Sequence, residues 1–120
     1  MSRASALPAA QVRDAAPLFA ALGDETRLRL IVRLSASGPE SIARLSARSA
    51  VSRQAIKKHL EVLSRAGLAR GSRRGREHIW ELEPRRLADA HGYLDRISRQ
   101  WDDALDRLRH FVEQDAGHPR

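Results

Sequence analysis

The sequence predicts a mainly α-helical fold with one small β-hairpin: a winged helix-turn-helix that is extended, and made dimeric, by a long C-terminal helix. Three observations lead to this prediction. A short helix, a tight connection and a longer capped helix follow one another within residues 41–66. Alternating residues on both sides of an arginine-rich turn predict a hairpin within residues 68–82. From Leu87 to Val112, apolar residues recur at steps of three and four, as on one long amphipathic helix.

Two helices are expected before this unit. Asp14 can cap a helix that runs to Leu22, and Asp24 can cap the next one. The second helix would turn four apolar side chains to the core and leave its arginines in solvent. The four are Leu28, Ile31, Val32 and Leu34, and the arginines are Arg27, Arg29 and Arg33.

The helix-turn-helix itself has a cap at each helix start. Ser41 can cap the short helix and Ser52 the longer one, which Gly67 would end. The longer helix carries apolar residues at helical spacing on one face, and these predict its buried side. They are Ile56, Leu60 and Leu63.

These elements predict one globular unit with short ends. The expected divisions are a tail or arm over residues 1–13, the winged helix-turn-helix over 14–84, a dimerisation helix of the same unit over 85–115, and a tail over 116–120.

The charge of the chain is concentrated in its middle. The net charge is +7, but the segment from Arg44 to Arg76 has ten basic residues and Glu61 as its one acid, so it carries +9 and the rest of the chain −2. Such a segment favours a surface for a polyanion over a solvated basic face.

The outward residues at the start of the longer helix are candidates for DNA contact. The second helix of a helix-turn-helix enters the major groove with its first residues. Arginine can bind guanine and glutamine can bind adenine there, while a basic hairpin tip can grip the backbone or enter the minor groove. The candidate DNA-binding residues are Ser52, Arg53, Gln54, Lys57 and Lys58 in the helix and Arg73, Arg74 and Arg76 in the hairpin.

The apolar seam of the last helix predicts a homodimer. At about 1.5 Å per residue it is roughly 37 Å long, which is more than so small a body can cover. The alternative is that the seam packs on its own domain. The expected dimer interface consists of Leu94, Ile97, Trp101, Leu105 and Leu108.

Three segments of the chain resemble the ArsR-type winged helix repressors: residues 19–31 (FAALGDETRLRLI), 51–68 (VSRQAIKKHLEVLSRAGL) and 74–80 (RGREHIW). The resemblance runs from about Ala15 to Leu82 and extends loosely into the last helix. It implies an obligate homodimer formed by the first and last helices. It also implies a sequence-specific regulator, usually a repressor, that binds a palindromic operator and is released by an effector.

The chain departs from the metal-sensing branches of these repressors. Those branches place cysteines near the third and fourth helices, or aspartate and histidine sets at the start of the last helix. This chain has no cysteine, and Asp89 with His91 has no second histidine three or four residues on. We therefore expect no metal, no cofactor and, if any effector exists, a small organic molecule between the first and last helices.

Other classes of protein fit the sequence less well. No phosphate loop, nucleophile elbow or catalytic triad is visible, so we expect no enzyme. Without a signal peptide or an apolar stretch long enough to span a membrane, a cytoplasmic protein without membrane contact is expected. A nonspecific DNA-coating protein and an antitoxin-like protein-interaction module remain as alternatives to the regulator.

Overall fold

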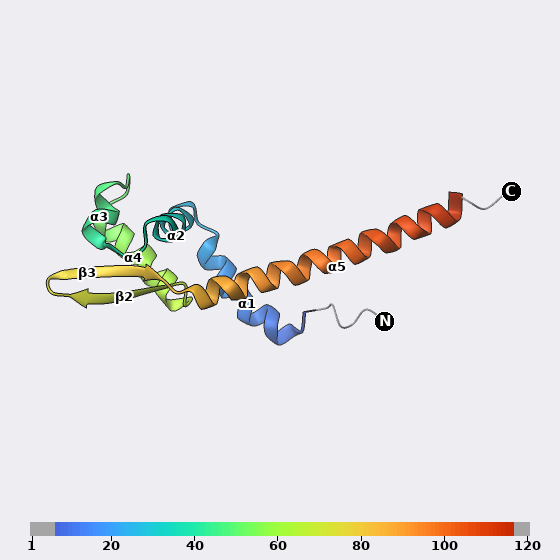
Figure 1. The fold of residues 1–120 in the computed structure, drawn as a ribbon, viewed down its shortest axis with the longest axis horizontal. Helices are drawn as coiled ribbons and strands as arrows, with labels where there is room; N and C mark the ends of the chain where they lie inside the picture. The colour runs from blue at the N-terminus through green and yellow to red at the C-terminus, as the bar shows by residue number, and fades with distance from the viewer. Residues whose placement is uncertain (1–6, 117–120) are drawn as a thin grey trace.

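The computed structural model, which describes residues 7–116, is a mainly helical winged helix-turn-helix, as the sequence predicts (Figure 1). In chain order its elements are α1 (Ala9–Leu22), α2 (Glu25–Ser37), β1 (Glu40–Ser41), α3 (Ile42–Ala47), α4 (Arg53–Arg65), β2 (Ala69–Arg74), β3 (Glu77–Leu82) and α5 (Pro84–Ala116).

Three helices begin where the sequence predicts, because a side chain caps each of them. In every case the cap accepts a hydrogen bond from the backbone N–H three residues later, which satisfies a donor without a partner inside the helix. Asp24 accepts from Arg27 at 3.0 Å, Ser41 from Arg44 at 3.2 Å, and Ser52 from Ala55 at 3.1 Å.

The core lies where α1, α2, α3, α4 and the hairpin meet. Its largest fully buried side chains come from all four helices and from the start of the hairpin, so no single pair of elements holds the fold together. They are Leu18, Leu34, Leu45, Ile56, Leu60, Leu63 and Leu68.

Helix α1 begins earlier than expected, and Asp14 is not its cap. Pro8 occupies the N-cap position, and its carbonyl accepts the backbone N–H groups of Gln11 and Val12 at 3.0 and 3.1 Å. Residues 9–13 are therefore helical and not part of a tail, and Pro17 lies inside the helix. Proline fixes φ near the helical value, so Pro8 holds the chain ready to enter a helix without a side-chain cap. Residues 1–6 and 117–120, where tails were also expected, lie outside the described residues.

The buried face of α2 differs from the prediction. Leu30, Ile31 and Leu34 are buried, whereas Leu28 is 48% exposed and Val32 is 61% exposed. Leu28 and Val32 are four residues apart and share a stripe beside the buried one, so they could not both turn inward with Leu30.

Two of the arginines expected in solvent are instead half-buried. Arg27 donates from Nε to the carbonyl of Ala21 at 2.7 Å, and Arg33 pairs with Glu40. Arg29 is exposed, as expected.

The hairpin is the larger part of a three-stranded antiparallel sheet with the order β1-β3-β2. Strand β1 was not predicted, because its two residues show no alternation. It exists because Glu40 and Ser41 pair with Trp80 and Ile79 of β3. The extra strand fixes the hairpin against the start of α3.

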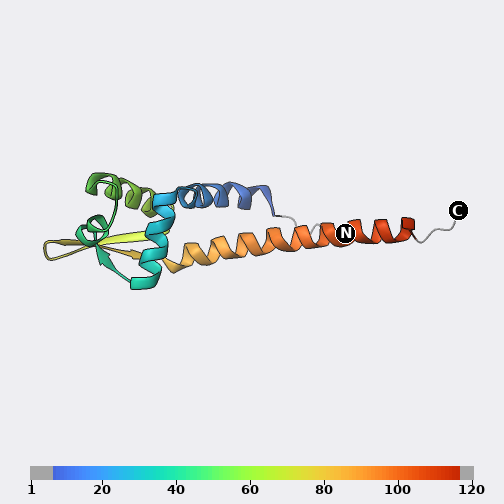
Figure 2. The same cartoon turned by 90° about the horizontal axis from the view of Figure 1, so that it is seen from above.

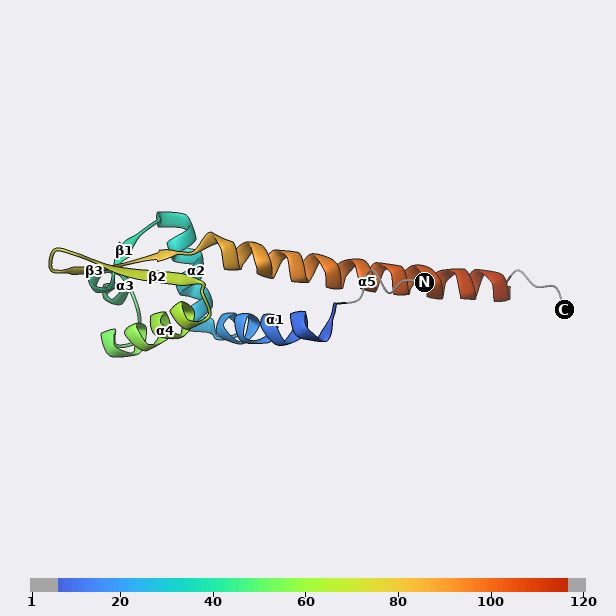
Figure 3. The ribbon, with the colours of Figure 1, turned by 90° about the horizontal axis from the view of Figure 1, so that it is seen from below.

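Helix α5 leaves the body of the protein after its first turns. Ala90 is its last buried residue, and the described molecule measures 78 Å along its longest axis. Figures 2 and 3 show α1 lying beside the first half of α5, while the second half projects alone. No helix within residues 7–116 is long and apolar enough to cross a membrane.

Polar contacts join α1 to α5. Tyr93 donates its hydroxyl to Asp14 at 2.5 Å, and Arg86 pairs with the same carboxylate at 3.2 Å. These two hydrogen bonds lower the pKa of Asp14 below its ordinary value of 3.8.

Candidate nucleic-acid interface

The start of α4 presents its polar side chains to solvent. Ile56 and Leu60 are buried beneath it, and this fixes the rotation of the helix. Arg53, Gln54 and Lys57 are consequently exposed on its outer side. The hydroxyl of Ser52 accepts the capping hydrogen bond, so this residue organises the helix start.

The hairpin faces the same space from the other side. Its register places Arg73 opposite His78 and Gly71 opposite Trp80, and residues two apart share a face of the hairpin. Arg73 and His78 therefore lie on the face that carries the buried Trp80. Gly75 has φ +64° in the turn, a conformation that glycine adopts without strain.

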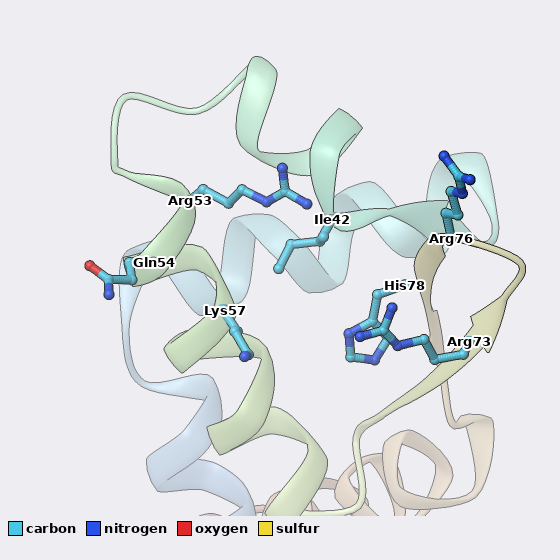
Figure 4. Close-up of a pocket in the computed structure, with 7 residues that line it drawn as sticks. All are labelled: Ile42, Arg53, Gln54, Lys57, Arg73, Arg76 and His78. Carbon is cyan, nitrogen blue, oxygen red and sulfur yellow. The ribbon is translucent and has the colours of Figure 1, made fainter.

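Between α4 and the hairpin lies a hollow of about 370 Å³. Figure 4 shows Arg53 and Lys57 extending from α4 toward the hairpin, which carries Arg73, Arg76 and His78. Gln54 points away from the hairpin. The residues that line the hollow are Ile42, Arg53, Gln54, Lys57, Arg73, Arg76 and His78.

Cationic side chains line the hollow from both α4 and the hairpin. The four ionised side chains that line it are Arg53, Lys57, Arg73 and Arg76, and none of its lining residues is an acid. Arg70 differs, because it lies on the other face of the hairpin and pairs with Glu81 and Glu83, each at 3.1 Å. Positive charge is thus left uncompensated between helix and hairpin, where an anion would be attracted.

The structure brings five of the eight predicted DNA-binding residues to this hollow: Arg53, Gln54, Lys57, Arg73 and Arg76. Lys58 is exposed on α4 but does not line it. Arg74 is exposed on the opposite face of the hairpin, since strand alternation separates it from Arg73.

Two lining residues were missed from the sequence. His78 reads as an ordinary strand residue, and Ile42 as an ordinary core residue. The signal for His78 was its register: a two-residue turn after Arg74 would have placed it opposite Arg73.

A polar cluster holds α4 against the ends of α1 and α2. Arg27 reaches the Nδ1 atom of His59 at 3.3 Å, and the same His59 atom lies 3.8 Å from Asp24. The backbone N–H of Arg27 is the main cause of the lowered pKa of Asp24. Asp24 and Arg27, at the start of α2, therefore help to position α4, which carries the outer residues of the site.

The predicted dimer residues share the exposed side of α5. Their exposed fractions range from 41% at Leu105 to 64% at Trp101. Phe111 and Val112 continue the stripe toward the end of the helix, and both are exposed. No residue of the described chain covers this stripe, which consists of Leu94, Ile97, Trp101, Leu105, Leu108, Phe111 and Val112.

The described residues offer few side chains placed to coordinate a metal ion. Within residues 7–116, no three His, Cys, Asp or Glu side chains are grouped so that they could share an ion. Asp89, which has a ligand-like spacing to His91 in the sequence, is paired with Arg86 at 3.0 Å. That the protein binds no metal stays a prediction.

Comparison with known proteins agrees with this geometry. A helix-turn-helix domain family matches residues 22–71. The HTH-type transcriptional regulator Rv2034 of Mycobacterium tuberculosis is 34% identical over 95 residues, which are 79% of this chain and 85% of the relative. The solved structure of an ArsR-like transcriptional regulator from Rhodococcus sp. RHA1 is 34% identical and has a TM-score of 0.74, covering 85% of this chain and 95% of that one.

The chain belongs to the ArsR family of helix-turn-helix transcriptional regulators. A second ArsR family regulator, RHA00566, has a similar fold at 25% identity, with a TM-score of 0.68 over 81% of this chain and 96% of that one. This ArsR protein is thus a DNA-binding transcriptional regulator.

Proposed function

We propose that this ArsR family protein is a homodimeric repressor that binds a palindromic operator with the outer residues of α4 and the hairpin tip. One observation carries the proposal: Arg53, Gln54 and Lys57 lie at the exposed start of a capped helix, and the hairpin on the other side of the hollow supplies Arg73 and Arg76. Base-reading and phosphate-binding side chains then meet one duplex together.

The two hairpin arginines that line the hollow would bind phosphates, and Gln54 would bind a base edge. Gln54 is exposed and points away from the hairpin in Figure 4, so it is free to meet a base edge. Lys58 and Arg74 are exposed beside the hollow and would add contacts to the flanking backbone.

The homodimer is supported by the uncovered stripe on α5. Burial of apolar surface is worth about 25 cal/mol per Å², so a row of exposed Leu, Ile, Trp and Phe side chains favours association with a second copy. A two-fold dimer presents two identical reading heads, and these call for an operator of two inverted half-sites.

The charges along α5 favour an antiparallel pairing of the two helices. Residues 84–99 contain four arginines and two aspartates, whereas residues 100–115 contain five acids and two arginines. In the antiparallel register that places Trp101 opposite the partner's Ala104, Asp106 would lie opposite the partner's Arg99, and only the central Asp102 and Asp103 would meet acids of the partner. Parallel helices would place every acid of the stripe's flanks beside its own copy.

Side-chain size favours the same arrangement. In an antiparallel pairing of the stripe, Trp101 can lie opposite the partner's Ala104, Leu94 opposite the partner's Phe111, and Ile97 opposite the partner's Leu108. In a parallel pairing, Trp101 would lie opposite the partner's Trp101 and overfill that layer of the interface. Ala104 would lie opposite the partner's Ala104 and leave its layer underpacked.

A regulator of this kind acts in the cytoplasm and performs no catalysis. Any effector would act by preferring one geometry of the α5 dimer, since equal affinity for two geometries shifts neither. The absence of cysteine excludes a thiol-based signal, which leaves a small organic molecule near α1 and α5, or control by the amount of protein.

Selection of bound sequences from random duplex DNA tests the proposal. The expected result is an enriched, inverted-repeat motif that is bound about 10³-fold more tightly than bulk DNA. Binding without an enriched motif would instead identify a nonspecific DNA-coating protein. A partner protein that co-purifies and blocks DNA binding would favour the antitoxin-like module.

A further inference from the structure

His78 is a half-buried imidazole in the DNA-facing hollow to which no role has been given. It lies on β3 opposite Arg73 and lines the hollow together with Lys57 (Figure 4). Ordinary core packing does not explain its position, since its ring borders a space lined by cations.

The ring of His78 is held in place by its neighbours on the hairpin. It packs against Trp80 with the ring centroids 4.8 Å apart and the ring planes tilted by 40°. Gly71 leaves the room that the ring occupies: a Cβ at that position would lie 2.6 Å from Nε2 of His78 and 3.0 Å from Cζ2 of Trp80. A glycine below and an indole beside it thus fix the imidazole before any ligand arrives.

Positively charged side chains surround His78 in the hollow. The ionised groups that face it are Arg53 and Lys57 from α4, Arg73 from β2 and Arg76 from the turn, and α3 contributes only Ile42. Arg74 and Glu77 lie on the other face of the hairpin.

We propose that His78 is a phosphate-binding residue of the DNA site and takes up a proton from solvent when a DNA phosphate enters the hollow. The inference rests on the proposed mode of DNA binding, in which α4 and the hairpin meet the backbone together. A phosphate beside the ring attracts the charged imidazolium more strongly than the neutral ring, so proton uptake accompanies binding in this proposal. Both ring nitrogens of the imidazolium are donors, whereas neutral imidazole offers one donor.

Proton uptake makes DNA affinity depend on pH. The complex binds more protons than the free protein, so affinity rises as pH falls. If DNA binding raises the proton affinity of His78 tenfold, DNA affinity can rise at most tenfold on protonation. We therefore expect DNA affinity to increase about three- to tenfold for each His78 as the pH is lowered from 8 to 6. DNA phosphodiesters keep their single charge over this range, so the change arises on the protein.

The experiment measures the affinity of the whole protein for a labelled random-sequence duplex at pH 6, 7 and 8 and constant low ionic strength. Calorimetry in buffers with different heats of ionisation counts the protons taken up. The variants are His78→Gln, which cannot be protonated, and His78→Lys, which is charged throughout. His110→Gln is the matched control, because His110 is an exposed histidine of α5.

The proposal expects affinity that rises toward pH 6 for the wild type and His110→Gln, weak and flat affinity for His78→Gln, and strong and flat affinity for His78→Lys. Full pH dependence in His78→Gln, or no proton uptake by the wild type, would overturn it. Tight binding without pH dependence would overturn only the role of His78. Failure to bind duplex at any pH would overturn the proposed mode of DNA binding as well. If His78→Gln does not fold, calorimetry on the wild type and His78→Lys still decides.

Discussion

Arg33 of α2 holds Glu40 of β1 through two hydrogen bonds, Nε to Oε2 at 2.8 Å and Nη2 to Oε1 at 3.0 Å. Both side chains are largely withdrawn from solvent. The same guanidinium also donates to the carbonyl of Arg44 at 3.1 Å. One arginine therefore joins the second helix to the first strand and to α3.

Removal of the Glu40 charge should destabilise the fold. Glu40→Gln leaves the half-buried Arg33 without its counter-charge, and we expect a loss of about 1–3 kcal/mol in the free energy of unfolding, measured with urea. The control is Glu25→Gln, which breaks the exposed pair with Arg29 and should cost no more than about 0.5 kcal/mol. Equal losses in the two variants would contradict the structural role of the Arg33–Glu40 pair.

Stability should fall in acid. The hydrogen bonds from Arg33 lower the pKa of Glu40 below its ordinary value of 4.5, and the pKa values of Asp14 and Asp24 lie below 3.8. The folded state prefers these three carboxylates ionised, so their contribution is complete above the ordinary values and is lost as pH falls through the lowered ones. Urea unfolding at several pH values should show this decline, with a shallower slope for Glu40→Gln. A free energy of unfolding that increases as the pH is lowered would contradict this prediction.

Truncation of the outer residues of α4 should reduce specificity. Arg53→Ala or Gln54→Ala should weaken binding to the selected operator by about 1–3 kcal/mol and relax the preference at one or two positions in each half-site. Arg65→Ala, at the far end of the same helix, is the control and should change little. Direct reading of bases by these residues is refuted if random DNA loses as much affinity as the operator.

The hairpin arginines should act through phosphates. Arg73→Gln or Arg76→Gln should weaken binding to all sequences alike and reduce the slope of log affinity against log salt by about one for each phosphate that the arginine no longer binds, or about two in a symmetric dimer. The control is Arg70→Gln, whose arginine is already paired on the other face of the hairpin. An unchanged slope in the double variant of Arg73 and Arg76 would exclude a hairpin that grips DNA.

The α5 stripe should control assembly. Trp101→Ala or Leu108→Asp should sediment as a monomer or unfold, because truncation of a buried anchor at an interface commonly costs about 2 kcal/mol or more and counts twice in a two-fold dimer. Arg109→Asp introduces an aspartate one residue along, off the stripe, and should stay dimeric although it changes the charge by two units instead of one. A dimer of full affinity in Leu108→Asp would place the interface on another element.

Introduced cysteines can distinguish the two helix directions, since the chain has none of its own. Leu94→Cys and Phe111→Cys proteins, unfolded and refolded together, should form a mixed disulfide, whereas either alone should not. Disulfides within each single variant would indicate parallel helices instead.

The sequence alone determined the helices that depend on local signals. Asp24, Ser41 and Ser52 marked three helix starts, the spacing of Ile56, Leu60 and Leu63 marked the buried face of α4, and the turn at Gly75 marked the hairpin. Caps, helical period and turn residues act within a few positions of the chain, so they can be read without a partner.

Tertiary structure decided what depends on contacts between distant residues. Strand β1 exists because Glu40 pairs with Trp80, and Leu28 is exposed because Leu30 takes the place at the core. His78 joins the candidate site because strand register and Gly71 turn its ring toward α4. Each of these depends on a neighbour many positions away or on the orientation of a whole element, and short-range periodicity carries no information about either.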